Sequence, residues 1–151
     1  MGPLISAGHL QAVSGFLDGV DVAFTGQAPS GAGYWLAPSV VLPKTPHDRI
    51  VTEEVFGPVV TVQRFRDEAE AIAMANDSHY GLSGSIWTRD IGRGLRAARG
   101  VETGALSVNS HSAVRYSTPF GGFKRSGIGR ELGPHAMDSF TETKNVFIAT
   151  D

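Results

Sequence analysis

The chain of 151 residues contains no cysteine. This absence excludes disulfide bonds, thiolate metal ligands and a cysteine nucleophile within the chain, because each of them requires a thiol. Apolar runs are short, and none reaches the roughly 20 residues that a membrane-spanning helix needs. The first ten residues, MGPLISAGHL, lack the charged and long apolar regions of a secretory signal. We therefore expect no membrane association and a cytoplasmic location.

An excess of charge of one sign is also lacking, since 13 basic and 15 acidic residues leave a formal net charge of −2. Nucleic acids and anionic membranes select for basic patches, so we expect neither as a partner. The five histidines lie at least 24 residues apart and form none of the short-range pairs that bind metals, so we expect no metal site. The nearest approach to a basic patch has the spacing of one solvated helix face: Arg89, Arg93, Arg96 and Arg99.

Glycine is abundant, with 19 residues that stand between short apolar runs and indicate many tight turns. Asp67 and Asp90 are suited to cap helices, and Glu70 lies where a capping box places its acid. Pro38 predicts that its strand is an edge strand or a broken one. Helices are expected at 6–18, with a possible Ser6 cap, 67–79, 90–99 and near 134–139, and strands at 34–42, 59–65, 82–88, 104–109 and 141–150.

Strands near residues 59, 82 and 104 alternate with helices near 67 and 90. This alternation predicts an α/β fold in which a parallel sheet is covered by helices. The composition, 41% hydrophobic and 19% charged, is that of one globular domain. We place one boundary near Phe140, which divides a body of residues 1–139 from residues 140–151, where a detached strand begins.

Two adjacent acids, Glu53 and Glu54, lie in the segment TEEVFGPVV (52–60). Neighbouring carboxylates shift each other's pKa and can act as an acid and base pair. A carboxylate can instead accept hydrogen bonds from ribose hydroxyls, or both acids can belong to a solvated turn. Adjacent side chains of an extended segment point to opposite faces, so only one acid can face a given site.

Other candidate functional residues follow the last predicted central strand. His111 lies just beyond the end of that strand, where open α/β sheets bind ligands, although it can equally be a surface histidine. The run PFGGFKRSGIGRELG (119–133) is not a dinucleotide fingerprint, because its glycine spacing is wrong and it follows a loop. It favours a structural turn around Phe120 or Phe123. Its basic residues can pair with Glu131 or with an external carboxylate.

Six segments together resemble the NAD(P)-dependent aldehyde dehydrogenase superfamily, in order and in spacing, and cover essentially the whole chain. The resemblance is greatest to the class that includes betaine-aldehyde and aminobutyraldehyde dehydrogenases. The segments are GPLIS (2–6), TEEVFGPVV (52–60), EAIAMANDSHYGLSGSIWTRD (70–90), GALSVN (104–109), PFGGFKRSGIGRELG (119–133) and FTETKNV (140–146).

The resemblance implies a role for several positions. Glu54 matches a glutamate that hydrogen-bonds the hydroxyls of the nicotinamide ribose, and Phe56 matches an aromatic beside the nicotinamide ring. Phe120 matches a residue of the aldehyde pocket. Glu131 matches a buried acid of a proton relay. The loop Ser110–Pro119 matches the wall of the substrate tunnel, with Ser110, His111 and Arg115 as its polar candidates.

The resemblance also implies what the chain does not carry. In this family a cysteine thiolate attacks the aldehyde, hydride passes to the nicotinamide, and water activated by a glutamate hydrolyses the thioester. Those groups lie upstream of the GPLIS segment, which begins here at Gly2. The chain therefore resembles the C-terminal part of the three-layer, parallel-sheet catalytic domain (1–139) with its oligomerisation arm (140–151). The implied cofactor is NAD or NADP.

Two hypotheses remain for the function. The chain is a fragment of an aldehyde-oxidising enzyme, inactive alone, which forms a homo-oligomer or joins a complementary fragment. Alternatively, it is a non-catalytic module that associates with full-length relatives through its terminal strand. An unrelated small-molecule binder on this fold is a third, weaker reading, and the sequence does not specify the aldehyde.

Overall fold

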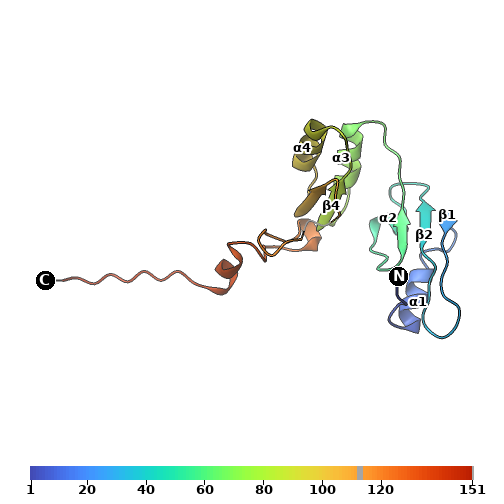
Figure 1. The fold of residues 1–151 in the computed structure, drawn as a ribbon, viewed down its shortest axis with the longest axis horizontal. Helices are drawn as coiled ribbons and strands as arrows, with labels where there is room; N and C mark the ends of the chain where they lie inside the picture. Colours follow the sequence, from blue (N-terminus) through green and yellow to red (C-terminus); the bar gives the residue numbers. More distant parts are fainter. Residues whose placement is uncertain (112–113, 151) are drawn as a thin grey trace. The chain divides into compact units, whose positions relative to one another are not determined.

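The computed structural model describes residues 1–111 and 114–150, and its contacts divide the chain into two units (Figure 1). Unit 1 is Met1–Arg66 and unit 2 is Asp67–Asp151. The mixed α/β character agrees with the predicted class. The division after Arg66 has no counterpart in the sequence-based prediction, and the boundary near Phe140 stays a prediction.

Unit 1 contains a three-stranded sheet of order β1-β2-β3, with β1 antiparallel and β3 parallel to the central β2. Helix α1 precedes the sheet and begins at its predicted cap, because the Ser6 hydroxyl accepts a hydrogen bond from the His9 N–H at 3.1 Å. The short helix α2 lies between β2 and β3. The bounds are α1 Ala7–Ser14, β1 Asp21–Thr25, β2 Ser39–Leu42, α2 Arg49–Thr52 and β3 Val59–Thr61.

The core of unit 1 lies on one face of this sheet. Along β2, Ser39 and Val41 are buried while Leu42 is exposed, as expected where alternate side chains point to opposite faces. The other buried apolar side chains of the unit are Val13 of α1 and Ile50 of α2. The buried side chains of unit 1 thus come from β2, α1 and α2, whereas every residue of β1 is exposed.

Unit 2 contains a parallel pair of strands joined by a helix, the predicted βαβ arrangement. Both predicted caps are present, since Asp67 accepts a hydrogen bond from the Glu70 N–H and Asp90 accepts one from the Arg93 N–H. Glu68 and Arg96 join the two helices through two hydrogen bonds of 2.8 Å. The bounds are α3 Glu68–Asn76, β4 Ser83–Ile86, α4 Ile91–Gly100 and β5 Ala105–Val108.

The glycine-rich run packs closely against the start of β5. A side chain at Gly104 would overlap the carbonyl oxygen of Gly121, and one at Gly122 would meet Ser126 at 2.6 Å. These glycines allow the backbone segments to approach each other, which supports the structural interpretation of the run. A short 3₁₀ helix, η1 Lys124–Ser126, lies within the run, and a second, η2 Ala136–Phe140, lies where the sequence predicted a helix near 134–139.

The predicted single parallel sheet is wrong for the described residues. The strand near residue 59 pairs with β2 in unit 1, whereas the strands near 82 and 104 pair with each other in unit 2. Strand β1 was missed, and β2 begins only after Pro38, whose carbonyl accepts a hydrogen bond from the Gly26 N–H. Because β1 occupies one side of β2 and β3 the other, β2 is central and not an edge strand.

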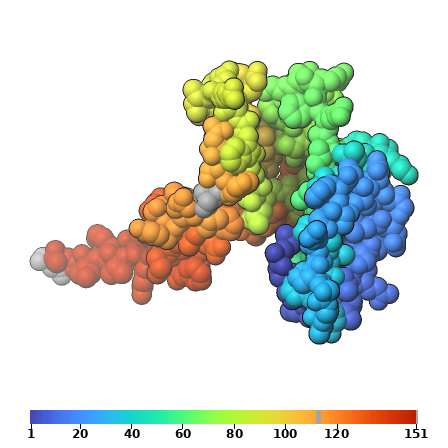
Figure 2. Space-filling view, turned by 45° about the vertical axis from the view of Figure 1, so that its right-hand side comes forward, coloured from blue at the N-terminus to red at the C-terminus, as the bar shows by residue number. Residues whose placement is uncertain are grey.

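The predicted terminal strand is not a strand in this structure. Residues 141–150 are exposed and form no helix or strand, and Figure 2 shows them in red as a projecting segment of unit 2. A strand needs a partner for its backbone groups. Among the described residues, none pairs with this segment, and Asp151 lies outside them. Whether it adds to another subunit stays a prediction.

Candidate functional site

The segment that carries the two acids is fixed to helix α1 at two points. His9 Nε2 donates a hydrogen bond of 2.9 Å to the carbonyl oxygen of Phe56. Gly57 lies so close to α1 that an added Cβ would be 2.5 Å from Val13 Cγ1. His9 and Val13 are four residues apart and so occupy the same face of the helix. The turn of residues 53–58, which we call the acid turn, is therefore held from behind by α1.

Phe56 is held in a conformation that an aromatic residue rarely adopts. Its φ is 54°, in the left-handed region where a side chain is strained. Phe56 is 74% exposed, and its ring centroid lies 6.3 Å from that of the His9 ring. A strained backbone that presents an apolar ring to solvent is typical of a functional position.

The two acids lie in different environments. Glu53 pairs with Arg49 at 3.0 Å, and the Arg49 guanidinium also lies 4.0 Å from the centroid of the Phe16 ring. Glu54 is exposed, and its carboxylate makes no hydrogen bond or ion pair with the part of the chain that the structure describes. Of the two acids, only Glu54 retains both carboxylate oxygens for a ligand.

In unit 2, the ends of the two parallel strands are tied together by Asn109. Its side-chain amide accepts a hydrogen bond from the Thr88 N–H and donates one to the Thr88 carbonyl, each at 2.9 Å. His111 follows, with its ring centroid 5.2 Å from that of Trp87. The Ser107 hydroxyl donates to the carbonyl of Ser110. His111 thus lies beyond the carboxyl ends of the strands, where the sequence placed it.

The remaining predicted residues lie around the loop that follows. Phe120 is half-buried and pairs with Glu131 through two backbone hydrogen bonds of 2.8 Å. Glu131 itself is exposed, which differs from the buried acid that the resemblance implied. Arg115 is exposed and donates to the carbonyl of Val114. Residues 112 and 113 of the predicted tunnel loop lie outside the described residues.

Two basic residues of the glycine-rich run have structural partners. Lys124 pairs with Glu102 at 2.8 Å, and not with Glu131. Arg130 donates to the carbonyls of Gly122 and Gly129 and lies 5.2 Å from the Phe123 ring centroid. These contacts tie Lys124 to the segment before β5 and Arg130 to the run itself.

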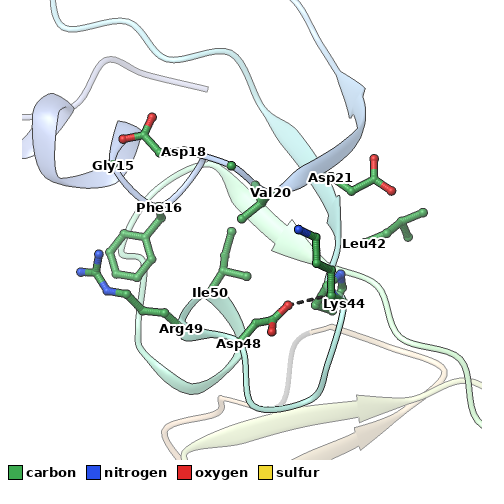
Figure 3. Close-up of a pocket in the computed structure, with 12 residues that line it drawn as sticks. Gly15, Phe16, Asp18, Val20, Asp21, Leu42, Lys44, Asp48, Arg49 and Ile50 are labelled. Carbon is green, nitrogen blue, oxygen red and sulfur yellow. Dashed lines mark hydrogen bonds between the residues drawn. The ribbon is translucent and has the colours of Figure 1, made fainter.

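Unit 1 also contains an open hollow of about 270 Å³ beside the end of α1 (Figure 3). Its wall brings together Phe16, Lys44 and Asp48, and the Asp48 carboxylate accepts a hydrogen bond from the Lys44 backbone. Hydrogen bonds from the Thr45 hydroxyl and backbone hold the pKa of Asp48 below its usual value. Because the acid is already satisfied and no predicted site residue lines the hollow, it adds nothing to the candidate site.

The sequence-predicted residues thus fall into two groups. Glu54 and Phe56 belong to unit 1, whereas Ser110, His111, Arg115, Phe120 and Glu131 belong to unit 2. His9, Trp87 and Asn109 were not predicted, because no local sequence pattern signals the contacts that they make with residues distant in the chain. Within the described residues there is no cluster of three metal-ligating side chains and no helix long and apolar enough to cross a membrane.

Comparison with known proteins identifies the fold and the family. The sequence profile of the aldehyde dehydrogenase family matches residues 1–146. An aldehyde dehydrogenase of Emericella nidulans is 41% identical over 128 residues, which are 85% of this chain and 26% of that protein. Betaine aldehyde dehydrogenase from Staphylococcus aureus, solved in complex with NAD+, is 40% identical with a TM-score of 0.86 over 93% of this chain and 30% of its own.

A Mycobacterium tuberculosis aldehyde dehydrogenase complexed with NAD+ is 37% identical with a TM-score of 0.89, over 99% of this chain and 32% of its own. The chain therefore spans about a third or less of the length of the relatives it matches. The family match covers nearly the whole chain. The solved structures match the same chain in fold at 37–40% sequence identity. The chain belongs to the aldehyde dehydrogenase family.

Proposed function

We propose that the chain supplies one wall of the cofactor site and part of the aldehyde pocket of an NAD(P)-dependent aldehyde dehydrogenase. This proposal rests on the different contacts of two adjacent acids, Glu53 and Glu54. Glu53 is engaged by Arg49 at 3.0 Å, whereas Glu54 has no partner among the described residues and is presented beside the strained Phe56. We assign a nicotinamide nucleotide to Glu54 and Phe56 as their ligand.

Glu54 fits the ribose of a nicotinamide nucleotide. Its carboxylate offers two acceptor oxygens on a turn that α1 holds rigidly, and a pair of neighbouring hydroxyls can donate one hydrogen bond to each oxygen. Hydrogen bonds to an ionised carboxylate contribute about 1.5–3 kcal/mol each. Glu54 therefore binds and orients, and it needs no proton transfer in this role.

Phe56 fits the nicotinamide end of the same ligand. Its exposed ring provides an apolar surface that excludes water from one side of the ring system. When bound, NAD(P) accepts a hydride in the oxidation of the aldehyde. The strained φ of Phe56 fixes where this apolar surface stands relative to Glu54.

The residues of unit 2 are proposed to serve the aldehyde. His111 is held against Trp87 at the ends of β4 and β5, and Phe120 is fixed by its bridge to Glu131. Together with Ser110 and Arg115, these side chains offer aromatic and polar surfaces for a small aldehyde that carries a carboxylate or another polar group. A relay role for Glu131 requires that other residues cover its carboxylate, which is exposed here.

The nucleophile must come from elsewhere, because none of the 151 residues is a cysteine. We expect no turnover by the isolated chain. Purified chain incubated with NAD+ or NADP+ and several aldehydes is expected to produce no absorbance at 340 nm. The companion measurement uses a chimera in which this chain replaces the matched 30% of the Staphylococcus aureus betaine aldehyde dehydrogenase. NADH formation by the chimera supports the proposal, and turnover by the isolated chain contradicts it.

The second candidate function is that of a non-catalytic module. The observation in its favour is the exposed segment 141–150, in which Val146, Phe147 and Ile148 are apolar. An extended segment of this kind can add to the edge of a sheet in a full-length relative or in a second copy. Analytical ultracentrifugation of the chain, alone and mixed with a full-length homologue, tests this function. A chain that stays monomeric and does not bind the homologue would contradict this function.

A further inference from the structure

Helix α1 contacts the acid turn through residues that share one of its faces. His9 donates through Nε2 to the carbonyl oxygen of Phe56, and Val13, which is 1% exposed, lies against Gly57. Phe16 follows in the turn after the helix, so the three residues have the i, i+4, i+7 spacing of one helix face. A single row of side chains thus supports the acid turn from the α1 side.

The acid turn is held at both of its ends. At its start, Glu53 pairs with Arg49. Near its other end, His9 holds the carbonyl of Phe56, whose φ of 54° is strained. Glu54 lies between these two contacts. Because an exposed ion pair contributes little to stability, the conformation of the turn depends mainly on its contact with α1.

The surroundings of the His9 ring indicate that this hydrogen bond is the reason for a histidine here. The residue is half-buried, and its second ring nitrogen, Nδ1, is buried without a hydrogen-bond partner among the described residues. A buried polar atom without a partner lowers stability, so an apolar side chain would suit the position better if packing were its only role. The other nitrogen, which donates to Phe56, accounts for the imidazole.

We propose that His9 is a positioning residue for the nicotinamide nucleotide. By holding the Phe56 carbonyl from behind, it keeps the acid turn in the conformation that presents the Glu54 carboxylate and the Phe56 ring to one ligand, and it does so without contact with that ligand. The inference rests on the proposed function. A turn that is ordered before binding has no ordering cost to meet when the ligand arrives. Where only a fraction of the molecules has the competent turn, the apparent Kd rises in inverse proportion to that fraction.

The experiment measures NAD+ binding by isothermal titration calorimetry in the chimera defined above, without aldehyde. The Staphylococcus aureus enzyme that supplies the rest of the chimera was solved in complex with NAD+. The variants are His9→Ala, Glu54→Gln and the double variant of both, with His9→Gln as the conservative replacement that retains a donor. The matched control is His47→Ala, which changes an exposed histidine of the same unit. The kcat and the KM for NAD+ are measured in parallel.

His9→Ala should raise the Kd for NAD+ roughly 3- to 10-fold, because one hydrogen bond no longer holds the turn. His9→Gln should restore most of the affinity, and His47→Ala should leave it unchanged. The kcat at saturating NAD+ should change little, since the bound cofactor orders the turn. In the Glu54→Gln background, His9→Ala should raise the Kd by a smaller factor, because the carboxylate that it positions is gone.

An unchanged Kd in His9→Ala, or an equal factor in both backgrounds, would overturn the proposal, because His9 would then not act through Glu54. His9→Leu fills the same space without a donor and should show the same rise in Kd, which covers a failure of His9→Ala to fold. Unfolding of both variants, seen by circular dichroism, would assign His9 to stability alone and would also overturn the proposal.

The outcomes separate this inference from the proposed function. If Glu54→Gln raises the Kd and His9→Ala does not, Glu54 binds the cofactor and only the role of His9 is wrong. If Glu54→Gln leaves the Kd unchanged, the proposed function is wrong and the role of His9 in it is wrong as well.

Discussion

His9 Nε2 lies 2.9 Å from the carbonyl oxygen of Phe56 and joins two segments that are 47 residues apart in the chain. The other ring nitrogen of His9 is buried and has no partner among the described residues. Among the described residues, Nε2–H therefore makes the one hydrogen bond of the His9 ring. Because Phe56 has a strained φ of 54°, this hydrogen bond helps to hold the acid turn in the conformation that presents Glu54.

Replacement of His9 with alanine should release the acid turn. A hydrogen bond of this kind is worth about 1 kcal/mol, which is comparable to the strain at Phe56. The strong amide-to-alpha proton Overhauser effect within Phe56, a mark of positive φ, should weaken in the NMR spectrum of His9→Ala. His9→Gln, which retains a donor, should restore it. The exposed His47→Ala is the control, and an unchanged Phe56 signal in His9→Ala would show that the hydrogen bond is not what fixes the turn.

Two glycine-to-alanine substitutions in unit 1 should change the free energy of unfolding in opposite directions. In Gly57→Ala the new Cβ meets Val13 Cγ1 at 2.5 Å, so the free energy of unfolding should fall by about 1–3 kcal/mol. Gly8 lies within α1 with open space around it, so Gly8→Ala should raise stability by roughly 0.5–1 kcal/mol. Urea denaturation monitored by circular dichroism measures both changes.

A double variant tests the same contact. Val13→Ala removes the methyl groups that the new Cβ would meet, so the loss caused by Gly57→Ala should be smaller in that background. Additive losses would mean that the two residues are not in contact.

Glu68 makes the stability of unit 2 depend on pH. Hydrogen bonds from Arg96, opposed in part by desolvation, hold the pKa of Glu68 below its ordinary value of 4.5 in the folded state. The ionised form is thus favoured by folding. Its contribution is complete above pH 4.5 and is lost as the pH falls through the lowered folded pKa. Acid unfolding followed by the amide signals of α3 and α4 measures the effect.

In Glu68→Gln the stability of unit 2 should fall less steeply below pH 4.5, because no carboxylate remains to be protonated at the Arg96 contact. Glu142→Gln, in the exposed segment after η2, provides the comparison. If both variants unfold in acid with the same pH profile, Glu68 is not the source of the pH dependence.

The sequence predicted those elements whose signals are local. Asp67 and Asp90 cap their helices because an aspartate just before a helix accepts a hydrogen bond from a free N–H group of its first turn. This contact is local and does not depend on the rest of the fold. The ion pair of Glu53 with Arg49, which distinguishes the two acids here, was not predicted. That pair has the i,i+4 spacing of a helical turn, which was a missed signal for α2.

What the sequence could not predict depends on long-range pairing. The strand at Val59–Thr61 looks like its successors at Ser83–Ile86 and Ala105–Val108, but it pairs with β2 and not with them. Residues 141–150 have a strand-like pattern and no partner among the described residues, so they form no strand here. The hydrogen bond from His9 to Phe56 joins distant segments and has no local signature.

The measurement that tests the central claim most directly compares Glu54→Gln with Glu53→Gln in the chimera defined above. Loss of the charge that accepts the ribose hydrogen bonds should raise the KM for NAD+ roughly 10- to 100-fold in Glu54→Gln. The stability of the isolated chain should change little, because Glu54 has no partner to lose. Glu53→Gln breaks only an exposed ion pair and should leave the KM nearly unchanged. Equal KM values in the two variants, or unfolding of Glu54→Gln, would contradict the account.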